Sequence, residues 1–69
     1  MSAVHGTPLS PRQRQVLALL ASGVRAKEIA GCLGLSQTTV RNHIRSVLRR
    51  LGSHSQLEAV AKAREWRLL

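Results

Sequence analysis

Residues 26–51 read AKEIAGCLGLSQTTVRNHIRSVLRRL, in which two runs with helical spacing of apolar residues flank a short turn. The second run places apolar residues on one helical face, at Val40, Ile44, Val47, Leu48 and Leu51. Gly34 permits a sharp turn, and Ser36 is a favourable N-cap for the helix that follows. The stretch therefore predicts a helix-turn-helix unit with helices near 26–33 and 37–51.

The outer face of the second helix of this unit is basic and carries no acidic residue. The residues that project away from its apolar stripe are Arg41, Asn42, Arg45 and Arg49. A solvated helix face usually mixes charge signs, because opposite charges four residues apart attract each other. The major groove of DNA accepts one helix and offers guanine acceptors to arginine and adenine edges to asparagine. We therefore predict that Arg41, Asn42 and Arg45 contact bases. Arg49 is assigned to the DNA backbone, and a merely solvated face of a helical bundle is the alternative.

Both helices of the unit begin with groups suited to phosphate. The helix near 37–51 opens with short polar side chains and free amides, at Ser36, Gln37, Thr38 and Thr39. Ordinary capping is the alternative for these residues and the preferred interpretation of Ser36. Arg25 stands at the N-cap position of the helix near 26–33, where a cation is unfavourable unless a DNA phosphate pairs with it and with Lys27. An Arg25 side chain that simply points to solvent is the alternative.

The flanking segments predict two further helices. A Ser-Pro-x-Gln start signal predicts a helix near 10–22, and a Ser-x-x-Glu capping box opens another near 55–65. Residues 1–8 have no periodicity and are interpreted as a flexible N-terminal arm or a linker remnant. The chain is therefore expected to be all-α, with one four-helix helix-turn-helix domain over residues 9–66.

The composition excludes several classes of protein. The 69 residues include 11 Lys and Arg against 3 acids, a formal net charge of +8, so the expected partner is a polyanion. A chain this short buries too little surface to shape a deep pocket, so an enzyme is not expected. Trp66 is the only aromatic residue, which argues against folds that stack single-stranded bases. One cysteine and three histidines without zinc-finger spacing predict neither a disulfide nor a metal or other cofactor, and they fit a reducing cytoplasm.

Several short motifs occur along the chain in a characteristic order. They are LSPRQRQVL at 9–17, Gly23, KEIA at 27–30, LGLS at 33–36, TVRNH at 39–43, LRRLG at 48–52 and SQLEAV at 55–60. Together they resemble the LuxR/NarL-type DNA-binding domain of bacterial transcription regulators. The resemblance implies that the third helix reads the major groove, that the fourth forms a two-fold dimer contact, and that the domain usually follows a sensor or receiver domain.

The family's functional positions transfer onto this sequence residue by residue. Its base-reading positions fall on Arg41, Asn42 and Arg45, in agreement with the charge pattern. Its backbone-contacting positions fall on Lys27, Thr39, His43 and Arg50, of which His43 flanks the apolar stripe. The chain departs from the family at Gln13, where glutamate is general, at Arg25 and Ala26, where a serine or threonine cap and a polar residue are usual, and at Gln56, where arginine is frequent. None of these departures lies on the predicted base-reading face.

The fourth helix is the expected contact between two copies of the chain. Leu57, Val60 and Ala61 are expected to face the core, as is Leu48 from the third helix. The expected dimer contact, a small patch on the outer side, consists of Ala59, Lys62, Ala63 and Trp66. So small a patch predicts a homodimer that is weak in solution and strengthened on DNA.

The sequence thus predicts sequence-specific binding of double-stranded DNA for transcription regulation, in the bacterial cytoplasm at the nucleoid. Candidate partners besides DNA and a second copy are RNA polymerase and an N-terminal regulatory domain outside this sequence. Two other functions remain open: a promoter-binding module like region 4 of sigma factors, and a protein-protein adaptor that does not bind DNA. A membrane-active peptide is disfavoured, because separately capped helices indicate a compact fold without interfacial aromatic anchors.

Overall fold

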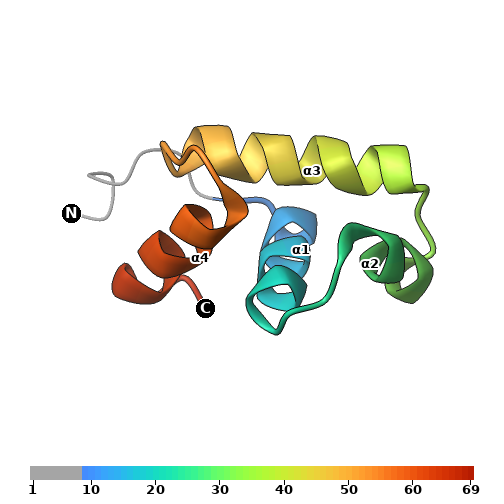
Figure 1. Cartoon of the computed structure of the whole chain (residues 1–69), viewed down its shortest axis with the longest axis horizontal. Coiled ribbons are helices and arrows are strands. Elements are labelled where there is room, and N and C mark those ends of the chain that lie inside the picture. Colours follow the sequence, from blue (N-terminus) through green and yellow to red (C-terminus); the bar gives the residue numbers. More distant parts are fainter. Residues whose placement is uncertain (1–8) are drawn as a thin grey trace.

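The computed structural model describes residues 9–69, which form four α-helices with no strand among them (Figure 1). The helices are α1 (Pro11–Ala21), α2 (Ala26–Leu33), α3 (Gln37–Arg50) and α4 (Gln56–Glu65). The longest, α3, lies along one side of the molecule, and α1, α2 and α4 all pack against it. The expected all-α four-helix architecture is confirmed, with each helix within one residue of its predicted bounds. The predicted N-terminal arm, 1–8, lies outside the described residues. No helix in the described part of the chain is long and apolar enough to span a membrane.

Serine side chains cap three of the four helices. Ser10 Oγ accepts a hydrogen bond from the Gln13 amide at 3.1 Å, and Gln13 Oε1 accepts one from the Ser10 amide at 2.9 Å, so this capping box is confirmed. Ser55 Oγ accepts from the Glu58 amide at 3.1 Å, but the Glu58 carboxylate accepts from the His54 amide instead of that of Ser55. The second predicted capping box is therefore only half formed, because the carboxylate reaches one residue further back along the chain.

The helix α2 begins without a side-chain cap, as the sequence predicted. Arg25 occupies the N-cap position, and its amide donates to Glu28 Oε1 at 3.1 Å. The Glu28 carboxylate places a negative charge at the helix N-terminus, which offsets the unfavourable cation there. After α2, Gly34 adopts a left-handed conformation with φ 67°, and the Leu35 amide donates back to Ala30 O at 2.9 Å. This turn brings α3 back against α2.

The core consists of two clusters of buried apolar side chains, both of which draw on α1 and α3. The cluster shared with α4 contains Leu9, Leu17, Val47, Leu51, Ala59 and Ala63. The cluster shared with α2 contains Val16, Ile29, Ala30, Val40 and Ile44. Leu48 is partly exposed, yet it packs against both clusters. The predicted apolar stripe of α3 therefore faces the core, and Leu48 joins its two halves.

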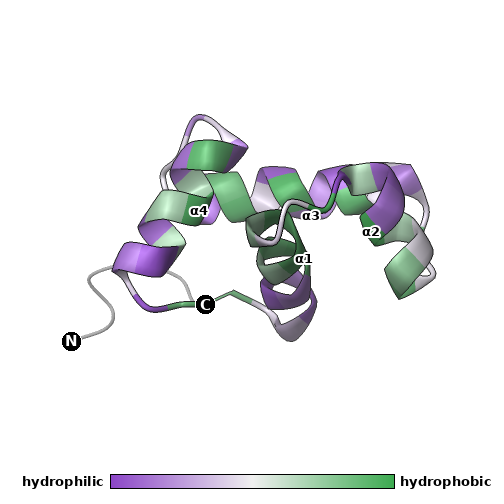
Figure 2. Ribbon diagram, turned by 60° about the horizontal axis from the view of Figure 1, so that its bottom comes forward, coloured by the Kyte–Doolittle hydropathy of each residue, from purple (hydrophilic) through white to green (hydrophobic). Residues whose placement is uncertain are grey.

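The predicted orientation of α4 is wrong. Ala59 and Ala63, expected on its outer side, are 1% and 0% exposed, whereas Leu57, expected in the core, is 83% exposed. Ala61 is also exposed, and Val60 is half-buried. Apolar and polar residues alternate along α4 (Figure 2), so two different faces of this helix have apolar residues at helical spacing. Small alanines occupy the inner face, where they allow α4 to lie close to α3.

Two cations of α4 donate hydrogen bonds to carbonyl groups at the C-terminal ends of other helices. Lys62 Nζ donates to Leu51 O at 3.1 Å and to Gly52 O at 2.8 Å, directly after α3. Arg64 Nη2 donates to the carbonyl of Ala21, the last residue of α1, at 3.1 Å. Cations are favourable at helix C-termini, where the last carbonyls lack intrahelical partners. The ammonium of Lys62, a residue expected at the contact between copies, is therefore used within the chain.

Replacement of Leu48 by alanine is expected to destabilise the domain by about 2 kcal/mol or more, because this side chain joins both core clusters. Leu57→Ala is the matched control: its side chain is 83% exposed, so a change within about 0.5 kcal/mol is expected. Thermal unfolding followed by circular dichroism measures both variants. Equal losses of stability in the Leu48→Ala and Leu57→Ala variants would show that the orientation assigned to α4 is incorrect.

Glu58 is expected to make the stability of the domain depend on acid pH. The hydrogen bond from the His54 amide, with a further contribution from the Lys62 charge, lowers the pKa of the Glu58 carboxyl below its ordinary value of 4.5. A carboxyl group whose pKa is lower in the folded than in the unfolded state stabilises the fold when the pH is above the unfolded-state pKa. That stabilisation is lost as the pH falls through the folded-state pKa. Glu58→Gln is therefore expected to flatten the decline of the unfolding free energy below pH 4.5. Urea unfolding across the acid range measures this slope, and a slope equal to that of the wild type would contradict the assignment.

Candidate nucleic-acid interface

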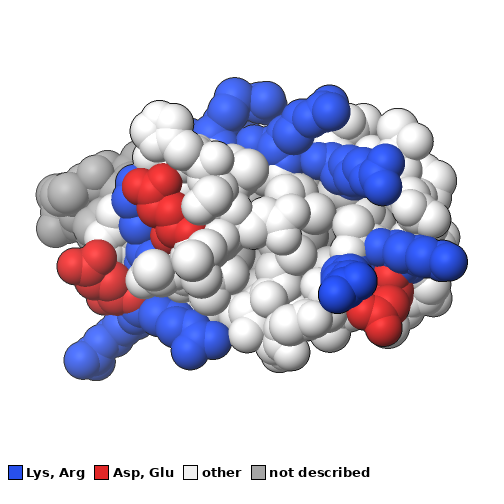
Figure 3. All heavy atoms as spheres, viewed as in Figure 1, with Lys and Arg blue, Asp and Glu red and all other residues white. Residues whose placement is uncertain are grey.

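The outer side of α3 carries a row of exposed polar side chains, which we call the α3 basic face: Arg41, Asn42, Arg45 and Arg49. The opposite side of the helix carries the buried residues Val40, Ile44 and Val47. Figure 3 shows lysine and arginine side chains gathered along the α3 edge of the molecule. The three acidic residues of the chain lie on α2 and α4: Glu28, Glu58 and Glu65. The structure thus brings the predicted base-contacting residues together on one accessible and positively charged surface.

The arginines of the α3 basic face have at most neutral partners among the described residues. Arg41 Nη2 lies 3.5 Å from Gln37 Oε1, at the long limit of a hydrogen bond, and Arg49 Nη2 donates to Ser46 Oγ at 3.3 Å. Arg45 makes no hydrogen bond or ion pair with any residue of the described range 9–69. The guanidinium donors on this face therefore remain available to an anionic or hydrogen-bonding ligand.

The start of α3 presents open backbone amides. Ser36 Oγ accepts from the Thr39 amide at 3.0 Å and donates to Thr39 Oγ1 at 2.9 Å, so Ser36 acts as an ordinary N-cap. Gln37 and Thr38 are exposed, and their amides have no acceptor within the part of the chain that the structure describes. A phosphate oxygen is a suitable acceptor for such amides at a helix N-terminus.

The other predicted backbone contacts come from α2 and from the remainder of α3. Arg25 and Lys27 are exposed at the start of α2, which packs against α3. Glu28 lies beside them and binds the Arg25 amide, a negative neighbour that the sequence prediction did not consider. His43 is half-buried, as expected for a residue that flanks the apolar stripe, and Arg50 is exposed in the last turn of α3. None of these side chains is buried in the core.

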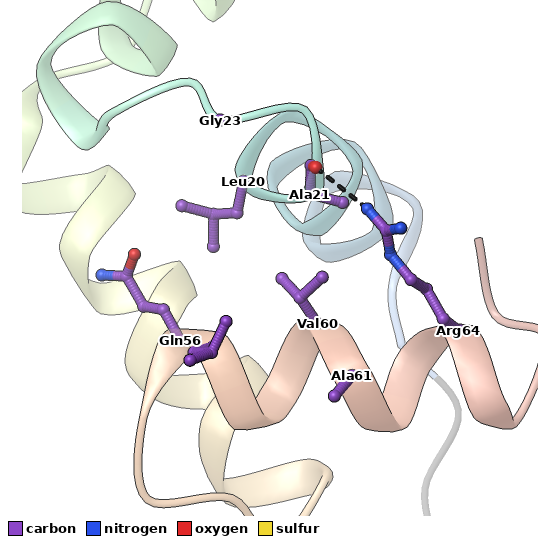
Figure 4. Close-up of a pocket in the computed structure, with 8 residues that line it drawn as sticks. Leu20, Ala21, Gly23, Gln56, Val60, Ala61 and Arg64 are labelled. Atoms are coloured by element: carbon purple, nitrogen blue, oxygen red, sulfur yellow. Dashed lines mark hydrogen bonds between the residues drawn. The ribbon is translucent and has the colours of Figure 1, made fainter.

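Sequence reasoning missed an apolar groove between α1 and α4 (Figure 4). Its volume is about 520 Å³, and it is lined by Leu20, Ala21, Gly23, Gln56, Leu57, Val60, Ala61 and Arg64. Arg64 reaches across from α4 to bond the Ala21 carbonyl. The groove exists because α4 turns Ala59 and Ala63 to the core and leaves Leu57 outside. The signal in the sequence was the second apolar face of α4.

The family described as "Bacterial regulatory proteins, luxR family" matches residues 7–63, which include all of α1, α2 and α3 and most of α4. The chain belongs to the luxR family. A luxR-family helix-turn-helix domain is a DNA-binding module of transcriptional regulators and not an enzyme.

Individual luxR-family relatives cover most of this chain. It is 40% identical over 61 residues to the transcriptional regulatory protein DesR of Bacillus subtilis (strain 168), covering 88% of this chain and 31% of DesR. It is 39% identical over 62 residues to the HTH-type transcriptional regulator MalT of Serratia proteamaculans (strain 568), covering 90% of this chain and 7% of MalT. It is 45% identical over 58 residues to the HTH-type transcriptional activator RamA of Corynebacterium glutamicum, covering 84% of this chain and 21% of RamA. The chain thus spans less than a third of the length of these luxR-family relatives.

Replacement of Arg45 by alanine is expected to weaken binding to a specific duplex by about 1–3 kcal/mol, because one bidentate contact with a base has that value. Binding to a random duplex is expected to change little. Arg14→Ala is the matched control, since Arg14 is an exposed arginine on α1 and does not belong to the α3 basic face. Fluorescence anisotropy measures both affinities. Equal losses on the specific and random duplexes would show that Arg45 contacts only phosphate.

Proposed function

We propose that this luxR-family domain binds double-stranded DNA sequence-specifically and regulates transcription, with α3 in the major groove. The observation that carries this proposal is the α3 basic face, an exposed row of arginine and asparagine side chains with no acid on the same helix. A major groove about 12 Å wide accepts one helix, and guanine and adenine edges match these side chains. The names of the relatives, which describe transcriptional regulators and an activator, support the same function.

The contacts divide into two groups. Base contacts are assigned to Arg41, Asn42 and Arg45. Backbone contacts are assigned to Arg25, Lys27, Ser36, Gln37, Thr38, Thr39, His43, Arg49 and Arg50. The open amides of Gln37 and Thr38 support a phosphate at the start of α3, and there Ser36 contributes mainly by capping the helix. Phosphate contacts of this kind fix the register of α3, while the base contacts supply sequence information.

The proposal includes a homodimer formed through α4, with a contact surface that differs from the expected one. Ala59 and Ala63 are excluded from it by their burial. The exposed Leu57 and the groove beside it, to which Ala61 and Arg64 contribute, form the revised surface. Trp66 and the stem of Lys62 are partly exposed at its margin. A surface of this size falls short of the 1,200–2,000 Å² typical of stable complexes, so we expect pairing to be weak in solution and strengthened on adjacent half-sites.

Two partners besides DNA and a second copy are proposed, and the first is a regulatory domain inferred from the length of the relatives. Because this chain spans less than a third of each, we propose that it acts together with a regulatory domain N-terminal to it. RNA polymerase is a further proposed partner, and the bacterial cytoplasm, at the nucleoid, is the proposed location. The family match over residues 7–63, which includes most of α4, favours this assignment over a sigma-factor region 4 module.

Selection of bound duplexes from a random pool tests the proposed function. A two-fold repeated motif is expected, with half-sites about one helical turn apart, because each copy inserts one α3 helix. A single unrepeated motif would support DNA reading but contradict the dimer. Absence of binding to any duplex at low salt would overturn the proposal in favour of a protein-protein adaptor.

Leu57→Glu is expected to abolish cooperative binding of two copies to the selected duplex, because it places a charge in the apolar contact between them. Gln15→Glu, on an exposed position of α1, adds the same charge elsewhere and is expected to leave cooperativity intact. Analytical ultracentrifugation of the protein–duplex mixtures measures the stoichiometry. Cooperative binding of the Leu57→Glu variant would show that copies pair through a different surface.

A further inference from the structure

The junction between α3 and α4 is held by the side chain of Lys62. Its ammonium donates to the carbonyls of Leu51 and Gly52, at 3.1 and 2.8 Å, where the chain leaves α3. Gly52 has a left-handed conformation with φ 61°, and Lys62 Nζ lies 3.8 Å from the place where a Cβ atom on Gly52 would stand. Lys62 therefore binds the inside of the turn that sets the direction of α4.

Two other side chains, Glu58 of α4 and Trp66 directly after it, lie near the same ammonium. Glu58 Oε2 lies 3.6 Å from Lys62 Nζ, and the centroid of the Trp66 ring lies 5.9 Å from it. The second oxygen of Glu58 accepts from the His54 amide at 2.7 Å, so this carboxylate binds both the ammonium and the connecting segment. The Lys62 side chain is 28% exposed, and its charge is largely engaged in these contacts. The turn after α3 is thus bonded to residues one and two turns into α4.

The buried apolar contacts that α4 makes with α3 come from small side chains. Ala59 and Ala63, each with a single methyl group, are the members of α4 in the buried cluster that contains Val47 and Leu51, and Val60 packs against this cluster from a half-buried position. Contacts of methyl groups are non-directional, whereas hydrogen bonds weaken steeply with distance and angle. Lys62 supplies two such directional bonds at this junction.

We propose that Lys62 is a positioning residue that sets the angle between the base-reading helix α3 and the outer surface of α4, and thereby the half-site spacing that a pair of copies accepts. This inference rests on the proposed function, because it needs two copies on one duplex. In such a pair α4 forms the contact between copies and α3 enters the groove, so the angle between these helices fixes the distance between the two reading helices. Arg64, which bonds to Ala21, ties α4 to α1 instead and makes no bond to α3 among the described residues.

The test measures the affinity of the protein for three kinds of duplex. The first carries two half-sites at the separation found by the selection experiment, and the second carries them one or two base pairs closer together or further apart. The third carries a single half-site. Lys62→Met keeps the stem but removes the donors, and it is expected to reduce the preference for the selected separation by about tenfold, since avidity depends on geometry. Its affinity for the single half-site is expected to stay within about twofold of the wild type, because Lys62 is not part of the α3 basic face. Lys62→Arg retains donors for both carbonyls and is expected to restore most of the preference.

Two further variants separate positioning from other roles. Glu58→Gln keeps the acceptor for the His54 amide but removes the charge beside the ammonium, so it is expected to give a smaller loss of spacing preference than Lys62→Met. Arg14→Met removes one positive charge from an exposed site on α1 and is expected to leave the preference unchanged.

The possible outcomes distinguish this inference from the proposed function. A spacing preference that survives both Lys62→Met and Glu58→Gln overturns the inference alone. An equal loss on single and paired half-sites also overturns it, because Lys62 would then act on folding or on DNA contact. If Lys62→Met does not fold, the Glu58→Gln result decides: an unchanged preference overturns the inference, and a reduced one supports it. Failure of the wild type to bind any duplex contradicts the proposed function itself.

Discussion

The division of α3 into a buried side and a basic side is the constraint on which the rest of the domain depends. The other helices contain 11, 8 and 10 residues, and isolated helices shorter than about 12–15 residues are marginal in water. Each of them packs against the buried side of α3, and both core clusters include residues of that side. The basic side is consequently left bare, because the apolar residues available for packing are all on the other half of the helix.

A strongly basic chain with three acidic residues has few carboxylates with which to balance its cations. Backbone carbonyls at helix C-termini fulfil that role at two places, where Lys62 and Arg64 donate to the ends of α3 and α1. The partial negative charge of a helix C-terminus makes such contacts favourable without a buried ion pair. The cations of α4 thus serve the fold, whereas the arginines of the α3 basic face remain available for a partner.

Local signals predicted most of the fold. Serine caps, Gly34 and the apolar stripe of α3 act over a few residues, so they specify helix bounds and the faces of α3 directly from the sequence. The orientation of α4 could not be predicted in this way, since Ala59 and Ala63 share a face at helical spacing just as Leu57 and Ala61 do. Packing against α3 decides between these faces, because the close approach of two helices favours small residues on the inside. The bonds of Lys62 and Arg64 span ten or more residues, and no periodic pattern reveals them.

The exposure of the candidate site residues on α3 could be predicted for the same local reason. Exposure of Arg41, Asn42 and Arg45 follows from the periodicity of α3, whereas the engagement of Ser36 by Thr39 and the carboxylate beside Arg25 depend on side-chain conformation. The groove beside Leu57 arises from the packing of α1 against α4, two helices that are far apart in the sequence. The sequence therefore left undetermined both the conformations of individual polar side chains and the features that need two distant elements.

The length of α3 gives the junction at its C-terminal end a mechanical consequence. Fourteen residues at 1.5 Å each make a rod of about 21 Å, with Lys62 acting at one end and the open amides of the first turn at the other. A rotation of about 10° at the α4 end displaces the far end by about 4 Å, which is close to the rise of about 3.4 Å between successive base pairs. A small change of angle at the α4 end of α3 therefore moves its other end by about one base step. In the proposed pair of copies on DNA, the few hydrogen bonds at the α4 end would limit how closely the two copies keep the same register.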